Sequence, residues 1–190
     1  MPARILDISD PNIKIPDLVV LDTSIVLELR TNLPKPHPNH ILVVNILNRL
    51  CYLASQGQVM LLLPLLAFEE CLFKICKNEI MAITPITVNW EQYYKANPQI
   101  ILKSKQTLNS FCEILKSFPI VIVEPEDIAV LPIGTARRLA DRMPELILDF
   151  QVLPKDATIL SVAERLGVDT VVTLDRDWRR ADGFTVITTL

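Results

Sequence analysis

The sequence predicts an α/β fold: a three-layer α/β/α sandwich around a mostly parallel five-stranded sheet. Short, continuous apolar runs such as 18–21 are typical of strands that are covered on both faces, as in parallel sheets. Segments with helical periodicity alternate with these runs along the chain, as in α/β proteins. The chain has 190 residues, of which 50% are apolar, and a net charge of −3, which suits a packed core and excludes global disorder.

The first part of the chain is expected to be an extended leader followed by a strand. Residues 1–17 are polar and contain three prolines, so we expect a single domain over 18–190. The run LVVL at 18–21 is the first strand. The next three residues, Asp-Thr-Ser at 22–24, have side chains that suit the N-cap of a helix.

The next elements are a long helix, a strand and a second long helix. Three prolines predict a loop at 33–40, and the periodicity predicts a helix over 41–56 that ends before Gly57. The apolar run 59–63 is the second strand. Pro64 suits the first turn of the next helix, which extends to about residue 81.

A helical insertion is expected over about 83–118, with helices around 90–118 that are interrupted near 97–98. The third strand follows at 120–123. Several prolines leave the organisation of 125–144 open.

The last part of the chain returns to the helix–strand alternation. Apolar residues at helical spacing predict a helix over 155–166, with Gly167 as its C-cap. The runs 169–175 and 184–188 are the fourth and fifth strands, which completes the expected sheet.

Composition restricts the classes of function. A pI near 5.4 excludes a broadly basic nucleic-acid-binding protein, so a phosphate ligand would have to meet a local basic patch or metal ions. The four cysteines form no CxxC pair, and the longest apolar run, 59–68, is too short to span a bilayer. We therefore expect a cytoplasmic protein without membrane contact. The mean hydropathy of +0.33 predicts an apolar interface, such as that of a homodimer.

Two aspartates stand at the ends of expected strands. Asp22 ends the first strand and Asp175 ends the fourth, after the similar sequences VVLD and VTLD. Ligands of open α/β sheets bind outside the carboxyl ends of the strands, so both side chains would face one crevice if these strands are neighbours. For either aspartate alone, a helix N-cap is an equally good explanation.

The helix after the second strand carries two adjacent glutamates that are not equivalent. An apolar stripe is formed by Leu65, Leu72 and Cys76. Glu69 falls inside this stripe, whereas Glu70 aligns with two lysines, as on a solvated face. We therefore expect Glu69 to face inward, where a carboxylate needs a cation. A different rotation of the helix would instead leave it at the rim.

A fourth acid, Asp156, lies at the start of the helix over 155–166, where the helix dipole favours an anion. Considered alone, Asp156 can be explained as an acid that stabilises the start of a helix. Together with Asp22, Glu69 and Asp175, however, it would form a cluster of like charges that needs a counterion. Carboxylate oxygens select Mg²⁺ or Mn²⁺ over zinc, and such a site can activate water for attack at phosphorus.

Three segments of the sequence resemble the PIN-domain nucleases, a family that includes the toxin ribonucleases of toxin–antitoxin pairs. They are LVVLDTSIVL, LPLLAFEECL and LPKDATILSVAERLGVDTVVTLDRDW, and the last is the most specific. The stretch 82–150 matches the family poorly. The resemblance implies cleavage of single-stranded RNA with Mg²⁺ or Mn²⁺ and a sheet in which the ends of the first and fourth strands meet.

The resemblance also implies roles for individual residues. The acidic quartet would be Asp22, Glu69, Asp156 and Asp175, with Asp177 as an auxiliary acid. The hydroxyls of Thr173 and Ser24 would support the site, although β-branching and helix capping also explain them. Arg176, between two of the acids, is a candidate for phosphate binding.

The leading hypothesis from the sequence is a metal-dependent endoribonuclease. The resemblance suggests that it is the toxin partner of a protein antitoxin. Asp22, Asp156 and Asp175 would hold the metal, and Glu69 would hold it too or position the attacking water. Cleavage would leave a 3′-hydroxyl and a 5′-phosphate. A non-catalytic PIN-like module that binds protein or RNA is the alternative. A phosphatase-like hydrolase is disfavoured, because the DTS sequence lacks a second acid two residues after Asp22.

Overall fold

The structure, a computed structural model, describes residues 2–29, 37–124, 127–128 and 139–189. The described chain forms a parallel sheet with the strand order β1-β6-β5-β2-β3-β4. The strands are β1 (Arg4–Asp7), β2 (Leu18–Leu21), β3 (Met60–Pro64), β4 (Ile120–Val123), β5 (Thr170–Val172) and β6 (Thr185–Thr188). The expected α/β architecture with a parallel sheet is confirmed.

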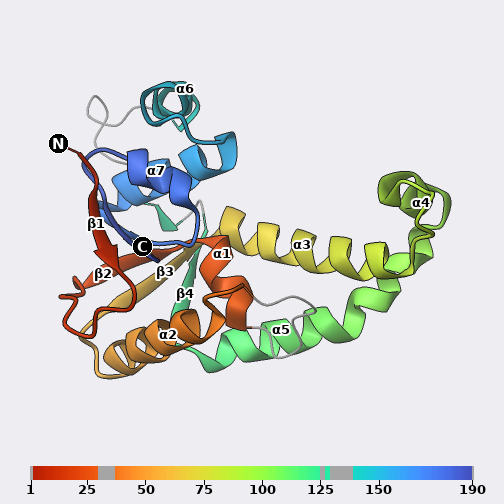
Figure 1. Cartoon of the computed structure of the whole chain (residues 1–190), viewed down its shortest axis with the longest axis horizontal. Helices are drawn as coiled ribbons and strands as arrows, with labels where there is room; N and C mark the ends of the chain where they lie inside the picture. The colour runs from red at the N-terminus through yellow and green to blue at the C-terminus, as the bar shows by residue number, and fades with distance from the viewer. Residues whose placement is uncertain (1, 30–36, 125–126, 129–138, 190) are drawn as a thin grey trace.

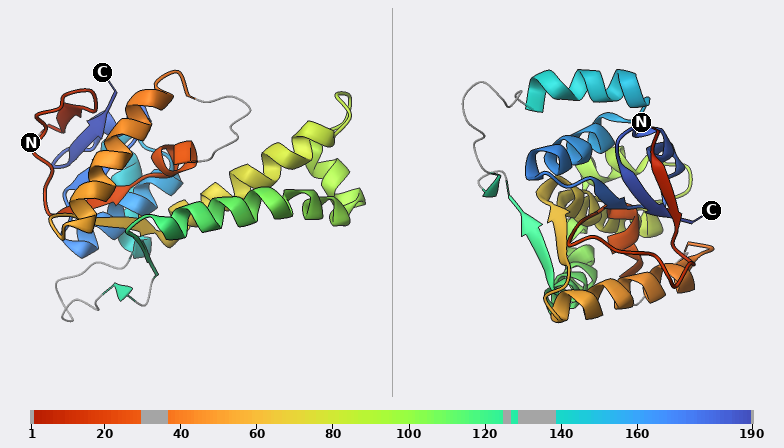
Figure 2. Two further views of the ribbon diagram at one scale, coloured as in Figure 1. Left: turned by 90° about the horizontal axis from the view of Figure 1, so that it is seen from below. Right: turned by 90° about the vertical axis from the view of Figure 1, so that its left-hand side faces the viewer.

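Helices cover both faces of this sheet. The described α-helices are α1 (Thr23–Val26), α2 (His40–Ser55), α3 (Leu65–Ile83), α4 (Trp90–Ala96), α5 (Lys105–Ser117), α6 (Leu139–Phe150) and α7 (Pro154–Leu166), and the 3₁₀ helices are η1 (Leu27–Leu29), η2 (Pro98–Ser104) and η4 (Arg176–Arg180). Helix α2 lies on one side of the sheet, and α6 and α7 lie on the other (Figures 1 and 2). The inner strands are buried from both sides, and Val19, Val20 and Leu21 of β2 are 0% exposed.

Helices α3 and α5 extend away from the sheet as an arm, with α4 and η2 at its tip (Figures 1 and 2). The expected interruption near 97–98 is present, because α4 ends at Ala96 and η2 begins at Pro98. A proline cannot donate the backbone hydrogen bond that would continue α4, but its fixed φ suits the first turn of a new helix. None of the described helices combines the length and the apolarity that crossing a membrane requires.

The sheet has six strands instead of the five predicted. The additional strand, β1, comes from the segment that was expected to be an extended leader, and it pairs in parallel with β6. Its sequence, RILD, contains two charged residues and no continuous apolar run. As an edge strand it hydrogen-bonds to one neighbour only and is partly exposed, so it needs no buried pattern that the sequence could reveal.

Other boundaries differ in ways that affect the site. The fourth predicted strand was expected to end at Asp175, but β5 ends at Val172, and Asp175 becomes the N-cap of η4. Within the segment 125–144, which the sequence left open, α6 begins at Leu139, while 125–126 and 129–138 lie outside the described residues. Gly167 ends α7 in the left-handed conformation with φ 69°, as expected of a C-cap.

Candidate active site

The candidate site lies at the carboxyl ends of β2 and β5, which are neighbours in the sheet. The chain continues from β2 to β3 on one side and from β5 to β6 on the other, so the connections that leave these two neighbouring strands run in opposite directions. Such a switch point leaves room for a ligand beyond the strand ends. The expectation that the first and fourth predicted strands meet is therefore confirmed.

Asp22, the first residue after β2, is the buried centre of this region. It is 5% exposed and forms the N-cap of α1. Its Oδ2 atom accepts hydrogen bonds from the Ser24 hydroxyl at 2.6 Å, from the Thr173 hydroxyl at 2.8 Å and from the Ser24 backbone N–H at 3.2 Å. Burial raises the pKa of Asp22, and the hydrogen bonds from Ser24 and Thr173 only partly offset this effect.

The same two hydroxyls connect the loops that follow β2 and β5. The Ser24 hydroxyl accepts a hydrogen bond of 2.9 Å from the Leu174 backbone N–H, and the Thr173 hydroxyl accepts one of 3.0 Å from the Asp175 N–H. Each hydroxyl therefore donates to Asp22 and accepts from the β5 loop. Asp175 in turn caps η4 by accepting the Asp177 backbone N–H at 2.9 Å. This network fixes the position of the Asp175 backbone relative to the Asp22 side chain.

Asp156 approaches the same region from the first turn of α7, where it is partly buried. Desolvation raises the pKa of Asp156 to about 6, and the negative charges of Asp22, Asp175 and Glu70 add to this shift. The indole N–H of the buried Trp178 acts in the opposite direction, although no partner lies within hydrogen-bonding geometry of it. The structure thus brings Asp156 into electrostatic contact with both strand-end aspartates.

The predicted orientation of Glu69 is wrong. Glu69 is exposed, whereas Glu70 is partly buried and accepts a hydrogen bond of 2.9 Å from the hydroxyl of Thr23, beside Asp22. The fully buried stripe of α3 consists of Ala67, Cys71 and Ile75, not of the stripe inferred from the sequence. Because each residue turns a helix by about 100°, this change of phase moves Glu69 outward and Glu70 toward the site.

Two lysines accompany Glu70. Its Oε1 atom lies 3.1 Å from Lys74 Nζ and 3.3 Å from Lys155 Nζ. Burial opposes ionisation of Glu70, but the Thr23 hydrogen bond and both lysine charges outweigh it, so the pKa of Glu70 is lowered. The sequence pattern predicted a solvated face for Lys74 and did not indicate a role for Lys155 or Thr23. In the sequence, the one indication that Lys155 lies near the site is its position directly before Asp156, in the first turn of the same helix.

The remaining predicted residues lie at the margin. Asp177 is exposed, and its carboxylate pairs with Arg180 at 2.9 Å. Arg176 is exposed at the first residue of η4. Neither side chain has a described contact with Asp22 or Asp156. Asp177 or Arg176 would therefore take part in binding only through a ligand that extends from the Asp22 region to η4.

The donor set fits a hard divalent cation. The ligands available near Asp22 are carboxylate and hydroxyl oxygens. Desolvation, and after it the charges of Asp22 and Asp175, raise the pKa of Asp156, and a bound cation would offset both effects. Within the described ranges, no three His, Cys, Asp or Glu side chains lie close enough to hold an ion by themselves.

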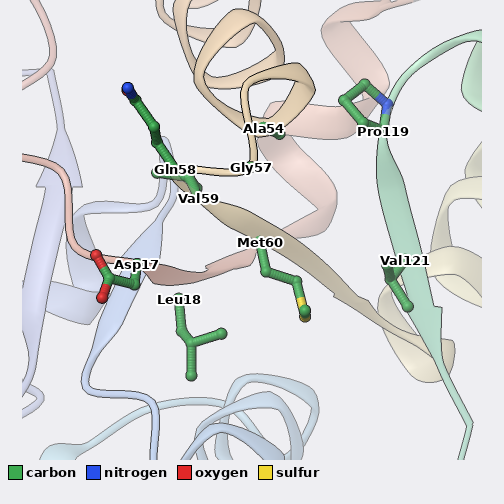
Figure 3. Close-up of a pocket in the computed structure, with 9 residues that line it drawn as sticks. All are labelled: Asp17, Leu18, Ala54, Gly57, Gln58, Val59, Met60, Pro119 and Val121. Atoms are coloured by element: carbon green, nitrogen blue, oxygen red, sulfur yellow. The ribbon is translucent and has the colours of Figure 1, made fainter.

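A separate cavity of about 690 Å³ lies at the opposite, amino-terminal ends of β2, β3 and β4. It is lined by Asp17, Leu18, Met60 and Val121, among other residues, and Figure 3 shows these side chains around the strand starts. No carboxylate of the Asp22 region lines it. The cavity is therefore distinct from the candidate active site.

Comparison with known proteins agrees with the observed fold. The family model described as "PIN domain" matches residues 19–184. Among solved structures, the chain is similar to VapBC2 from Rickettsia felis, whose crystal structure was determined bound to a DNA fragment from their promoter. The TM-score is 0.53 at 13% sequence identity, covering 90% of this chain and 98% of that one. No curated protein matches the sequence. Because the family model spans most of the chain, this protein belongs to the PIN domain family.

Proposed function

We propose that this protein is a metal-dependent endoribonuclease that hydrolyses phosphodiester bonds in single-stranded RNA. The observation that carries the proposal is that acidic residues gather beyond the ends of β2 and β5: the Thr173 hydroxyl bonds both the Asp22 carboxylate and the Asp175 N–H, and Asp156 lies near enough to interact with both charges. Such a concentration of like charges destabilises the folded protein unless a bound ligand neutralises them, and it is therefore typical of functional sites. A divalent cation with a phosphate is the ligand that this chemistry suits.

Each acidic residue has a distinct role in the proposal. Asp22, Asp156 and Asp175 would hold Mg²⁺ or Mn²⁺, directly or through water. When bound, the ion would neutralise phosphate charge and lower the pKa of a water molecule. Ser24 and Thr173 orient the Asp22 carboxylate toward the site.

Glu70, which its lowered pKa keeps ionised at neutral pH, would accept a hydrogen bond from the attacking water. This role replaces the one that the sequence suggested for Glu69. Attack by water, and not by the ribose 2′-oxygen, leaves a 3′-hydroxyl and a 5′-phosphate on the cleaved strands.

We further propose that the protein acts as the toxin of a toxin–antitoxin pair, held inactive by a protein antitoxin, and that it forms a homodimer. The similarity in fold to VapBC2 supports a partner protein. Co-expression with the product of a small adjacent gene, followed by size-exclusion chromatography with light scattering, tests both assemblies. A chain that elutes as a monomer and binds no such product would contradict them.

The two adjacent glutamates provide the sharpest test of the active site. Glu70→Gln removes a carboxylate from the site, whereas Glu69→Gln changes an exposed neighbour on the same helix turn. With an unstructured RNA and Mn²⁺, we expect Glu70→Gln to lower the cleavage rate by about 100-fold or more and Glu69→Gln to retain it. Cleavage should stop in EDTA, and the products should carry 5′-phosphates.

Equal losses in both variants, or cleavage that persists in EDTA, would contradict the assignment. RNA binding without cleavage under any metal condition would instead identify the non-catalytic PIN-like module.

A further inference from the structure

One face of α3 leads from the candidate site outward along the arm. Glu70, Phe73, Lys74 and Lys77 are separated by the three- and four-residue steps that place side chains on one side of a helix. The first of these residues touches the site and the last lies about 10 Å farther along the helix axis. Helices α7 and α4 flank α3 on the same side in Figure 1.

Lysines and aromatic rings alternate along this face. The ring of Phe73, a residue that is 49% exposed, meets the Trp90 ring edge-on at a centroid distance of 6.1 Å. Lys155 Nζ lies 5.7 Å from the centroid of Phe73, and Lys77 Nζ lies 5.5 Å from that of Trp90. Lys155 also contacts Glu70, so it joins the site to the first ring.

Beyond Phe73 the surface continues into a cavity of about 370 Å³ between α3 and α4. Its lining includes Lys77, Trp90, Tyr94 and Lys95, together with one acid, Glu91. We refer to Phe73, Lys77, Trp90, Tyr94, Lys95 and Lys155 as the lysine–aromatic track. The track is a local basic surface on a chain whose net charge is −3.

We propose that the lysine–aromatic track binds one flank of a single-stranded RNA beside the scissile phosphate. The inference rests on the proposed ribonuclease function and deepens it. Lysine ammonium groups pair with the phosphates, and the aromatic rings provide surfaces on which bases stack, a combination typical of sites for unpaired strands. A duplex, whose bases stack on one another, would leave the rings unused.

The alternative occupant of the same surface is a segment of a protein. Two observations favour RNA. The track is continuous with the carboxylates through Lys155, so a strand held there leads directly to the candidate site. Its charged residues are three lysines, Lys77, Lys95 and Lys155, against a single lining glutamate, which complements a polyanion.

The first experiment measures binding of the full chain to a fluorescein-labelled oligouridylate of about 12 nucleotides by anisotropy in EDTA, where metal-dependent cleavage is absent. We expect Trp90→Ala to weaken binding about tenfold and Trp90→Phe to restore most of the affinity, because phenylalanine still stacks. Tyr52→Ala removes a ring that is 65% exposed on α2, away from the track, and should bind like the wild type.

The second experiment measures salt dependence, which a purely structural role would not change. Lys77→Gln should reduce the slope of log K against log salt concentration by about 0.7, the value for one lost phosphate contact on a single strand. Lys14→Gln, at an exposed position before β2, should leave the slope unchanged.

A third measurement needs no substitution in the arm. Bases that stack on Trp90 should quench the wild-type tryptophan fluorescence, because the other tryptophan, Trp178, is 0% exposed. This readout stays informative if Trp90→Ala disturbs the arm tip.

The outcomes distinguish failure of the RNA-binding proposal for the track from failure of the ribonuclease proposal. Wild-type protein that binds and cleaves RNA, with track variants that match it in affinity, salt slope and quenching, would overturn the track and leave the ribonuclease in place. The track would also be overturned if its variants lose a protein partner but keep full RNA affinity. Wild-type protein that neither binds nor cleaves RNA would overturn both proposals. Binding that depends on the track without any cleavage would support the track and refute the nuclease.

Discussion

Thr173 donates a hydrogen bond of 2.8 Å from its side chain to the carboxylate of Asp22, across 151 residues of sequence. The same hydroxyl accepts the backbone N–H of Asp175 at 3.0 Å. One buried threonine therefore positions two of the proposed metal-binding aspartates. Together with the Ser24 hydroxyl, which accepts the Leu174 N–H, this threonine links the loops that follow β2 and β5.

Replacing Thr173 with valine keeps the shape of the side chain and removes both hydrogen bonds. Because the Asp22 carboxylate and the Asp175 N–H lose a buried partner, we expect the free energy of unfolding to fall by about 1–3 kcal/mol. For a chain of this length, the melting temperature should fall by about 2–4 °C per kcal/mol. Thr158→Val is the control, because the Thr158 hydroxyl donates to Pro154 O within its own helix and to the thioether of Met143 in α6, and has no charged partner. Equal melting temperatures for the two variants would contradict the role of Thr173.

The Asp22→Asn substitution should separate stability from activity. Burial raises the pKa of Asp22, so the ionised carboxylate costs stability in the absence of a cation. We expect the melting temperature to stay equal or rise, while metal-dependent RNA cleavage is lost. The exposed Asp182→Asn should change neither property. A large decrease in the melting temperature of Asp22→Asn would show that the carboxylate is structural.

The pH dependence of stability should reveal Asp156. Its pKa is raised from 3.8 to about 6 on folding, so the folded state holds this proton more tightly than the unfolded state does. The resulting stability penalty is complete above about pH 6 and absent below pH 3.8. As the pH falls from 7 toward 4 without metal, wild-type protein should gain stability relative to Asp156→Asn.

We expect this gain to be about 1 kcal/mol, because solvent screens the partly exposed group. Urea unfolding of both proteins at several pH values measures it. If the free energy of unfolding of the two proteins changes with pH in the same way, a raised pKa of Asp156 is excluded.

Manganese should bind and stabilise the folded protein. A ligand present at about 100 times its dissociation constant adds about 2.7 kcal/mol to the free energy of unfolding, which raises the melting temperature of a chain of this size by several degrees. The cation should also abolish the pH dependence that Asp156 causes, since it stabilises the ionised form. The melting temperature of Asp156→Asn should rise much less with Mn²⁺ than that of the wild type. A wild-type melting temperature that does not respond to Mn²⁺ would contradict a metal site.

Several parts of the fold and site follow from local sequence. Strands buried on both faces need continuous apolar runs, so β2 could be located from LVVL alone. Asp22 and Asp156 could be found because each follows or begins a recognisable element. The rotation of α3 could not be fixed in the same way. Leucines and cysteines occur on more than one side of this helix, so the sequence does not determine which stripe is buried.

The sequence by itself determined the order of the strands from β2 to β6 and the position of Asp22 directly after β2, because chain-local patterns of apolar and capping residues specify these features. Only the tertiary structure decided that β1 closes the sheet edge, that Glu70 and not Glu69 faces the site, and that Lys155 meets Phe73. Each of these depends on a contact between segments far apart in the chain. The free energy of such a contact comes from packing and charge in the assembled fold, and no local pattern encodes it.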